Sequence, residues 1–273
     1  MFERASRRSL VVLQLALCVM GTVRAAILIQ GDMTQEQRAK PGETYRGTIV
    51  LTNTDSVPGE AKVYQTDYSF SCDGTDTYGE PGRLPRSNAK WIGLSREVVT
   101  VPAKGKERID YEVAVPAAKG AGLSGTYWSM IMVEPIAQGS REAAGKVPDG
   151  TARVTQVLRY GVQIVTQIGK PGPAALSFTH PQLLKEGDKR LFAIDVANTG
   201  QQVLRPTLWI ELYSEAGKPI GKFHGAETRL YPGTSARFKI DLGATPNGKY
   251  LGMVAADGAG DNLFGANVEL EVK

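Results

Sequence analysis

The chain has 273 residues, a formal net charge of +4 and two cysteines, Cys18 and Cys72. The first 25 residues hold four arginines and one glutamate, so they carry three of the four positive charges and leave the remainder near +1. A remainder this close to neutral lacks the basic excess typical of proteins that bind nucleic acid or acidic membranes. Its one cysteine, Cys72, excludes an internal disulfide, so its stability must come from packed apolar cores.

The first segment in chain order, residues 1–25, has the pattern of a secretory signal peptide. A basic start is followed by an apolar run at 10–20, and Val23-Arg24-Ala25 precedes the expected cleavage site. The apolar run is shorter than the roughly 20 residues that span a bilayer. We therefore expect export to the periplasm, with the cell surface as the alternative, and no stable membrane insertion.

The rest of the chain has the pattern of a β-protein. Short alternating or apolar runs recur between Gly, Pro, Asn and Asp residues, which is typical of an antiparallel all-β fold. Residues 35–38 are predicted to form one helical turn, and 72–88 and 137–150 to form long loops. The predicted strands cover residues 48–52, 61–70, 108–115, 127–133, 154–168, 191–197, 207–213, 236–242, 250–255 and 267–272.

An internal repeat predicts two domains of one fold. A strand that ends in Asn53-Thr54-Asp55 corresponds to a later strand that ends in Asn198-Thr199-Gly200, and residues 101–105 correspond to 230–234 in the same order. Asn and Gly suit such turns because both tolerate positive φ. The Gly- and Pro-rich stretch 169–173 marks the boundary. We predict two immunoglobulin-like β-sandwiches in tandem, at residues 26–169 and 170–273.

Residues that carry chemistry are scarce. His180 and His224 lie beside turn residues with no spacing that would make a metal site. Cys72 has no evident partner base, and there is no nucleophile elbow, phosphate loop or dinucleotide fingerprint. We therefore expect no enzymatic activity, no metal and no cofactor.

Two strands are candidates for contact with a protein partner. The strand 127–133 is apolar on both faces, whereas a half-exposed strand has one polar face. One of these faces carries Trp128, Met130 and Met132, and it is either covered by a loop or the other domain or open to a partner.

The second candidate is the long strand 154–168, which is either a central, fully paired strand or an edge that accepts a strand from another protein. The predicted partner-binding residues on this strand are Val157, Arg159, Tyr160, Val162, Gln163 and Ile164.

Together, these features resemble the PapD-like superfamily of periplasmic chaperones, whose members assemble pilus subunits. The resemblance rests on the Asn-rich turn after 49–53, the Tyr127-Trp128 strand that closes at Pro135-Ile136, and the loop that leads into the long strand through 137–169. It implies two tilted domains with a cleft between them, and a subunit held along the long strand and the edge of the first strand.

The resemblance also implies an Arg and a Lys in the cleft that anchor the terminal carboxylate of the subunit. This sequence departs from that pattern, because 26–30 has no arginine and Gln163 stands where the lysine would fall. Arg159 and Lys170 are the candidate replacements.

Two hypotheses for the function follow. The first is a divergent chaperone that binds a secreted or surface-assembled, pilus-type subunit by strand addition. The second is a structural or adhesive envelope module that binds glycan or peptidoglycan, in which Tyr68, Tyr78 and Trp91 would stack on sugars.

Overall fold

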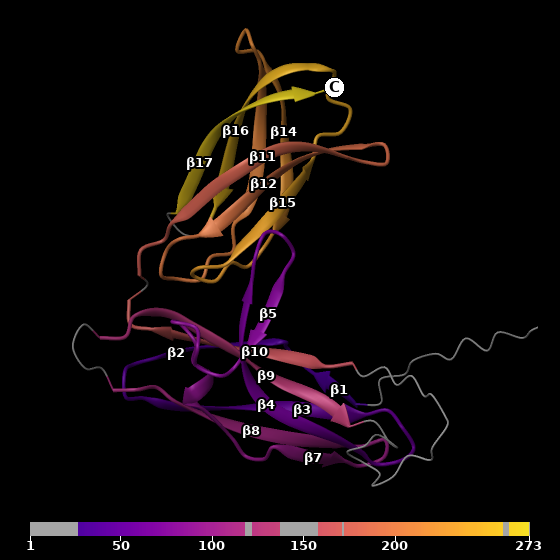
Figure 1. Ribbon diagram of the computed structural model, residues 1–273, viewed down its shortest axis with the longest axis vertical. Helices are drawn as coiled ribbons and strands as arrows, with labels where there is room; N and C mark the ends of the chain where they lie inside the picture. Colours follow the sequence, from indigo (N-terminus) through magenta and orange to yellow (C-terminus); the bar gives the residue numbers. More distant parts are fainter. Residues whose placement is uncertain (1–26, 118–121, 137–157, 171, 259–261, 273) are drawn as a thin grey trace, which may run out of the picture.

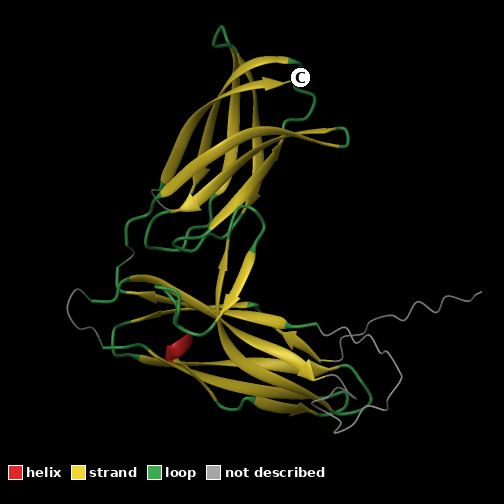
Figure 2. Cartoon of the chain, viewed as in Figure 1, coloured by secondary structure: helices red, strands yellow, loops and turns green. Residues whose placement is uncertain are grey.

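The computed structural model describes residues 27–117, 122–136, 158–170, 172–258 and 262–272. Nearly all regular structure in these ranges is β-strand (Figure 2), apart from one 3-10 turn at Ala89–Trp91. Among them, no helix is long and apolar enough to cross a membrane. The predicted signal peptide, the predicted loop at 137–150 and residues 154–157 of the predicted long strand lie outside the described residues.

The first domain is a sandwich of two sheets (Figure 1). Its core lies between them and includes Leu51, Ile109, Val133 and Val162, each with no more than 1% of its surface exposed. One sheet has the order β1 (Ile27–Gln30), β3 (Thr44–Asn53), β8 (Lys106–Ala114) and β6 (Ile92–Leu94). The other has the order β2 (Thr34–Ala39), β10 (Tyr160–Ile168), β9 (Gly125–Ile136), β4 (Gly59–Phe70) and β5 (Asp76–Gly79), with β7 (Val98–Val101) also paired to β4.

The second domain repeats this plan. Its core includes Phe192, Ile210, Leu230 and Ile240, all fully buried. One sheet has the order β11 (Leu176–Glu186), β12 (Lys189–Asn198) and β15 (Ser235–Asp241). The other has the order β14 (Pro219–Glu227), β13 (Thr207–Ser214), β16 (Gly248–Asp257) and β17 (Leu263–Val272). The prediction of an all-β chain with two immunoglobulin-like sandwiches is confirmed, and the connection between them follows Ile168 and ends before Leu176.

The internal repeat appears as one hydrogen-bond network built twice. The Asn53 amide donates to the carbonyls of Val57 (2.8 Å) and Val101 (3.1 Å), and the Asn198 amide donates to those of Gln202 (2.8 Å) and Leu230 (2.9 Å). Both asparagines are at least 99% buried. Each side-chain amide therefore links the turn that follows its own strand to a second turn more than thirty residues away in the sequence. The two sandwiches consequently have the same hydrogen bonds at this end.

Two sequence predictions about local structure are wrong. Residues 35–38 form part of strand β2 rather than a helical turn, because they pair with β10 over the register Thr34–Ala39. Tertiary pairing overrides the weak helical preference of this polar stretch. The predicted loop at 72–88 contains strand β5, which pairs with β4 to form a hairpin.

Candidate functional site

The chain segment from Ile27 to Ala39 supplies an edge strand to both sheets of the first domain. Its first half, β1, pairs antiparallel with β3, and its second half, β2, pairs parallel with β10. The switch follows Gly31, whose φ of 102° is a backbone conformation that favours glycine. Because the segment changes sheets, neither sheet is covered along its whole edge.

The uncovered part of the second sheet lies at the start of β10. Its pairing with β2 begins at Gln163, whose backbone N–H donates to the carbonyl of Met33 at 2.8 Å. Residues Tyr160–Val162 pair with β9 on one side and with no described strand on the other. Since backbone groups alternate in direction along a strand, the N–H and C=O of Gly161 point to this open side, as those of Gln163 do.

Strand β1 is also an edge strand. Within the described ranges it pairs with β3 alone, so its other side is unpaired. Both open stretches lie at the same end of the first domain, away from the second domain (Figure 1). At this end, main-chain groups of both sheets therefore face no described strand, and we call this surface the open edge: β1 together with residues 158–162.

The side chains that the sequence assigned to partner contact on β10 divide between the two faces of the strand. Val162 and Ile164 are fully buried in the core, and Tyr160 is half-buried against it. The expectation that the first two contact a partner is wrong, because they point into the sandwich. Arg159 lies on the outer side with 59% of its side chain exposed, 3.8 Å from Glu134.

Val157 and Leu158 precede β10 in the chain. Val157 lies outside the described part of the chain. Leu158 was not predicted, although it is a large apolar residue of the open edge with 51% of its surface exposed. It lies two residues before Tyr160, where β10 begins, and within the predicted strand 154–168.

Trp128 is covered by the second domain. Its ring stacks on that of Tyr231 with the centroids 4.8 Å apart and the planes 9° from parallel. Its Nε1–H donates to the carbonyl of Tyr68 at 2.8 Å, and only 5% of the residue is exposed. Of the two interpretations of this face, the structure therefore supports packing against the other domain at Trp128.

Met130 and Met132 are buried as well, at 7% and 8% exposure. They lie across Gly161, where an added Cβ would come within 2.7 Å of the Met130 sulfur and 3.1 Å of the Met132 sulfur. The missing side chain of Gly161 thus makes room for both thioethers. The prediction that they form an exposed surface for a partner is wrong.

Gln163 also belongs to the contact between the domains. Its Oε1 accepts hydrogen bonds from the hydroxyls of Tyr231 (2.5 Å) and Thr34 (3.3 Å). Burial raises the pKa of Tyr231, so its phenol stays neutral and donates. The cleft position where a lysine would fall is thus filled by an amide that already has two partners.

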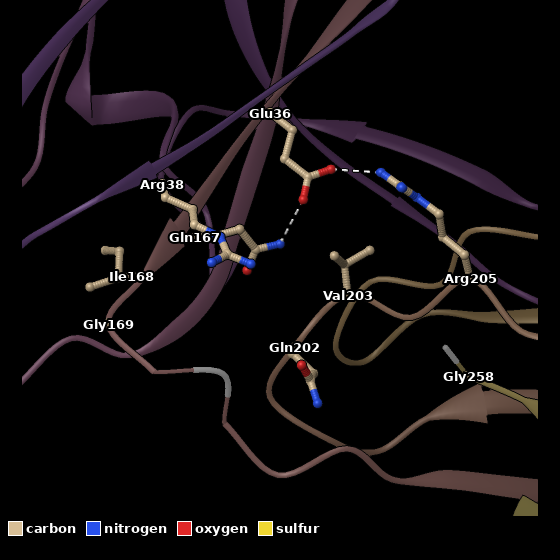
Figure 3. Close-up of a pocket in the computed structure, with 9 residues that line it drawn as sticks. All are labelled: Glu36, Arg38, Gln167, Ile168, Gly169, Gln202, Val203, Arg205 and Gly258. Carbon is tan, nitrogen blue, oxygen red and sulfur yellow. Dashed lines mark hydrogen bonds and ion pairs between the residues drawn. The ribbon is translucent and has the colours of Figure 1, made fainter. Parts of the chain in front are cut away.

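Charged groups lie beside these contacts, around a pocket of about 210 Å³ between the domains (Figure 3). Glu36 of β2 pairs with Arg205 of the second domain at 2.7 Å and accepts a hydrogen bond from Gln167 at 3.1 Å. Arg38 lines the same pocket. Sequence reasoning missed this group because Glu36 and Arg205 meet only through the tertiary fold.

The β4–β5 hairpin forms a second link between the domains (Figure 1). Phe70 packs against the core of the second domain, and its ring centroid lies 6.3 Å from that of Tyr231. At the hairpin tip, the amide of Cys72 donates to Ser235 Oγ at 3.0 Å. The cysteine is thus placed at a contact between the domains, where its side chain also hydrogen-bonds Asp195.

The two candidate cleft cations named from the sequence, Arg159 and Lys170, are not among the residues that line the pocket between the domains. Arg159 is at the far end of β10, beside Glu134. Lys170 is exposed just after β10 ends at Ile168. In the described residues, no group of three or more His, Cys, Asp or Glu side chains is arranged to hold a metal ion.

Comparison with known proteins finds likeness in fold. No protein-family model matches the chain, and no curated protein matches it. It is similar to a solved chaperone–tip adhesin complex of CFA/I fimbriae biogenesis, with 12% identity, 91% of this chain and 99% of the other covered, and a TM-score of 0.47.

Two further solved structures are similar over the same span. The CsuC–CsuE chaperone–tip adhesion subunit complex of Acinetobacter baumannii has 14% identity, 89% and 98% coverage, and a TM-score of 0.45. The CupB2 chaperone of Pseudomonas aeruginosa has 10% identity, 90% and 100% coverage, and a TM-score of 0.40.

Proposed function

We propose that this chain is a periplasmic, non-enzymatic chaperone that binds a secreted or surface-assembled, pilus-type subunit by strand addition at the open edge. The observation that carries the proposal is the start of β10, where Tyr160–Val162 pairs with β9 on one side and faces no described strand on the other. Unpaired main-chain groups on an ordered strand are a ready template for another chain. The location in the periplasm rests on the signal-peptide pattern of residues 1–25.

The rest of β10 is well suited to hold such an edge in place. Val162 and Ile164 anchor the strand in the core, and β9 pairs with it from Tyr160 to Ile168. The edge is therefore ordered before any partner arrives, which lowers the entropy cost of binding. Leu158 and Leu28, 51% and 36% exposed, add apolar surface at the same end.

In this proposal, binding depends on main-chain pairing more than on a carboxylate anchor in the cleft. Gln163 has no charge and is engaged by Tyr231 and Thr34. Arg205 is paired with Glu36, and Arg159 lies beside Glu134 at the other end of β10. A partner held at the open edge would gain its affinity from backbone hydrogen bonds and from apolar contact near Leu158.

The glycan-binding alternative has less support from the side chains that motivated it. Trp91 packs against Tyr127, with ring centroids 4.8 Å apart, and Tyr68 belongs to the cluster around Trp128. Tyr78 is the one of the three that is exposed, at 54%. A single tyrosine is a small platform for a sugar chain.

The test is a photo-crosslinking capture in the native periplasm. A photoreactive residue replaces Leu158 in the tagged, exported protein, and a second variant carries it in place of Lys218, an exposed residue of the other domain. We expect one recurrent partner crosslinked from 158 and absent from 218. Equal recovery from both positions, or recovery of cell-wall fragments alone, would contradict the proposal.

A pair of substitutions at Arg159 then separates main chain from side chain. Arg159→Pro removes an N–H on the open side of the strand, and Arg159→Ala removes the side chain but keeps that N–H. We expect the proline variant to lose the crosslinked partner and the alanine variant to keep it, with the melting temperature of both close to that of the parent. Loss in both variants would show that the guanidinium, not the strand edge, binds the partner.

A further inference from the structure

The second domain has an apolar groove on the outer face of its β14-β13-β16-β17 sheet. Tyr213, Leu251 and Met253 form its floor, and a space of about 530 Å³ lies over them. Leu251 and Met253 are 46% and 42% exposed. This volume is within the roughly 300–1,000 Å³ typical of ligand clefts.

The groove continues along β17 into a second depression of about 330 Å³, with which it shares Leu251 and Glu269. Here the border is acidic. Glu215, Glu269 and Glu271 line the two depressions with Lys249 as the one basic residue, so three negative charges and one positive charge give a net charge of −2. The whole chain is positive, at +4, so this acidity is local to the groove.

Strand β17 adds a free edge to this surface. It is the last strand of its sheet, and over its ten residues from Leu263 to Val272 it pairs with β16 alone among the described strands. Glu269 and Glu271 point to the outer face, whereas Val268, Leu270 and Val272 point inward and are at least 91% buried. A strand added beside β17 would meet carboxylates on its outer face and apolar side chains on its inner face.

We infer that this surface binds an extended segment in which basic and apolar residues alternate, and that the segment adds to β17 as a further strand. Cross-strand pairs of opposite charge stabilise adjacent strands, so Lys or Arg would lie opposite Glu269 and Glu271. The inner apolar residues of the segment would extend the core at Leu270. The site is on a different domain from the open edge and does not depend on the proposed chaperone function.

The charge of the groove decides between this occupant and a second copy of the chain. A copy that pairs its own β17 with this one would bring a second set of carboxylates, Glu269 and Glu271, to the same edge. Like charges on adjacent strands destabilise the pair. A basic segment has the opposite sign at each of these positions.

The test uses a labelled, acetylated and amidated ten-residue peptide that alternates lysine and valine, and a matched peptide with glutamate in place of lysine. Fluorescence anisotropy with the full-length mature protein measures both affinities at low and high salt. We expect binding of the lysine peptide and none of the glutamate peptide. Hydrogen exchange is expected to show protection of β17 amides when the lysine peptide is bound.

Matched variants locate the site. Glu269→Lys and Leu251→Ser are each expected to weaken the lysine peptide at least fivefold. Glu227→Lys makes the same charge change on an exposed residue of β14 that does not line the groove, and we expect it to leave the affinity within twofold. All three positions are exposed, so the melting temperature serves as the check on folding.

Three outcomes would overturn the inference. Equal binding of the two peptides would show that charge does not select the occupant. Equal loss with Glu227→Lys and Glu269→Lys would show diffuse electrostatic attraction. A concentration-dependent dimer that Glu269→Lys abolishes, without peptide binding, would assign the surface to a second copy.

Discussion

The stacked pair Trp128 and Tyr231 is expected to couple the stability of the two domains. Trp128 is 5% exposed and Tyr231 is 1% exposed, and their rings are 4.8 Å apart. Removing a buried aromatic side chain costs about 3–5 kcal/mol, and an aromatic pair contributes about 0.5–1.5 kcal/mol beyond the area that it buries. Trp128→Ala and Tyr231→Ala should each destabilise the protein by about 3 kcal/mol.

The double variant decides whether the two rings act together. If both rings stabilise the same contact, the double variant should lose about 1 kcal/mol less stability than the sum of the two single losses. Urea unfolding by circular dichroism and fluorescence measures the three variants, and coincident transitions from the two probes check that the domains unfold together.

A control and a refuting result complete this experiment. Trp209 lies on the outer face of the second domain beside Lys222, so Trp209→Ala combined with Trp128→Ala should be additive within about 0.5 kcal/mol. Additivity of Trp128→Ala with Tyr231→Ala within the same margin would refute a role for the stack in joining the domains.

Two other predictions concern single residues. The Arg237 guanidinium is hydrogen-bonded to Asp195 at 2.7 and 2.9 Å and holds the pKa of that carboxyl below its usual value. The ionised Asp195 therefore stabilises the fold above about pH 4, and this stabilisation is lost as the pH falls further. Asp195→Asn should flatten the dependence of the melting temperature on pH between 5 and 3, and an unchanged slope would contradict this. Gly125→Ala should destabilise the protein by more than about 1 kcal/mol, because φ is +79° and a Cβ would lie 2.1 Å from the carbonyl oxygen of Gln201 across the domain contact. Gly74→Ala, where φ is +85° and nothing lies within 4 Å, measures the cost of φ alone, and equal losses of melting temperature would show that the domain contact is not involved.

The two-domain fold could be predicted because the turn sequences that repeat are short and contiguous in the chain. Asn53 and Asn198 each end a strand and begin a turn, and the same order of turns follows in both halves of the chain. Period-two apolar patterns located most strands to within a few residues. The strand β2 could not be found in this way, since its sequence is polar and its pairing partner lies 129 residues away, as the bond from Thr34 to Gln163 shows.

The candidate site was harder to predict than the fold. Partner contact along the long strand stays a prediction, and two of the residues assigned to it, Val162 and Ile164, alternate with Gly161 and Gln163. That alternation already places them on the apolar, core-facing side. The cover over Trp128 could not be predicted, because nothing local to it indicates that Tyr231 of the other domain lies on its ring.

The equivalent turns of the two domains, at residues 101–105 and 230–234, differ in what they contact. Lys104 and Gly233 occupy the same place in the two turns, both with positive φ, so Pro102 corresponds to Tyr231. Tyr231 closes its end of the second sandwich against the first domain, whereas Pro102 is exposed at the corresponding end of the first. The same backbone turn therefore contacts the other domain in the second sandwich and is exposed in the first. The residue at this position, Tyr231 in the second domain and Pro102 in the first, distinguishes the two uses.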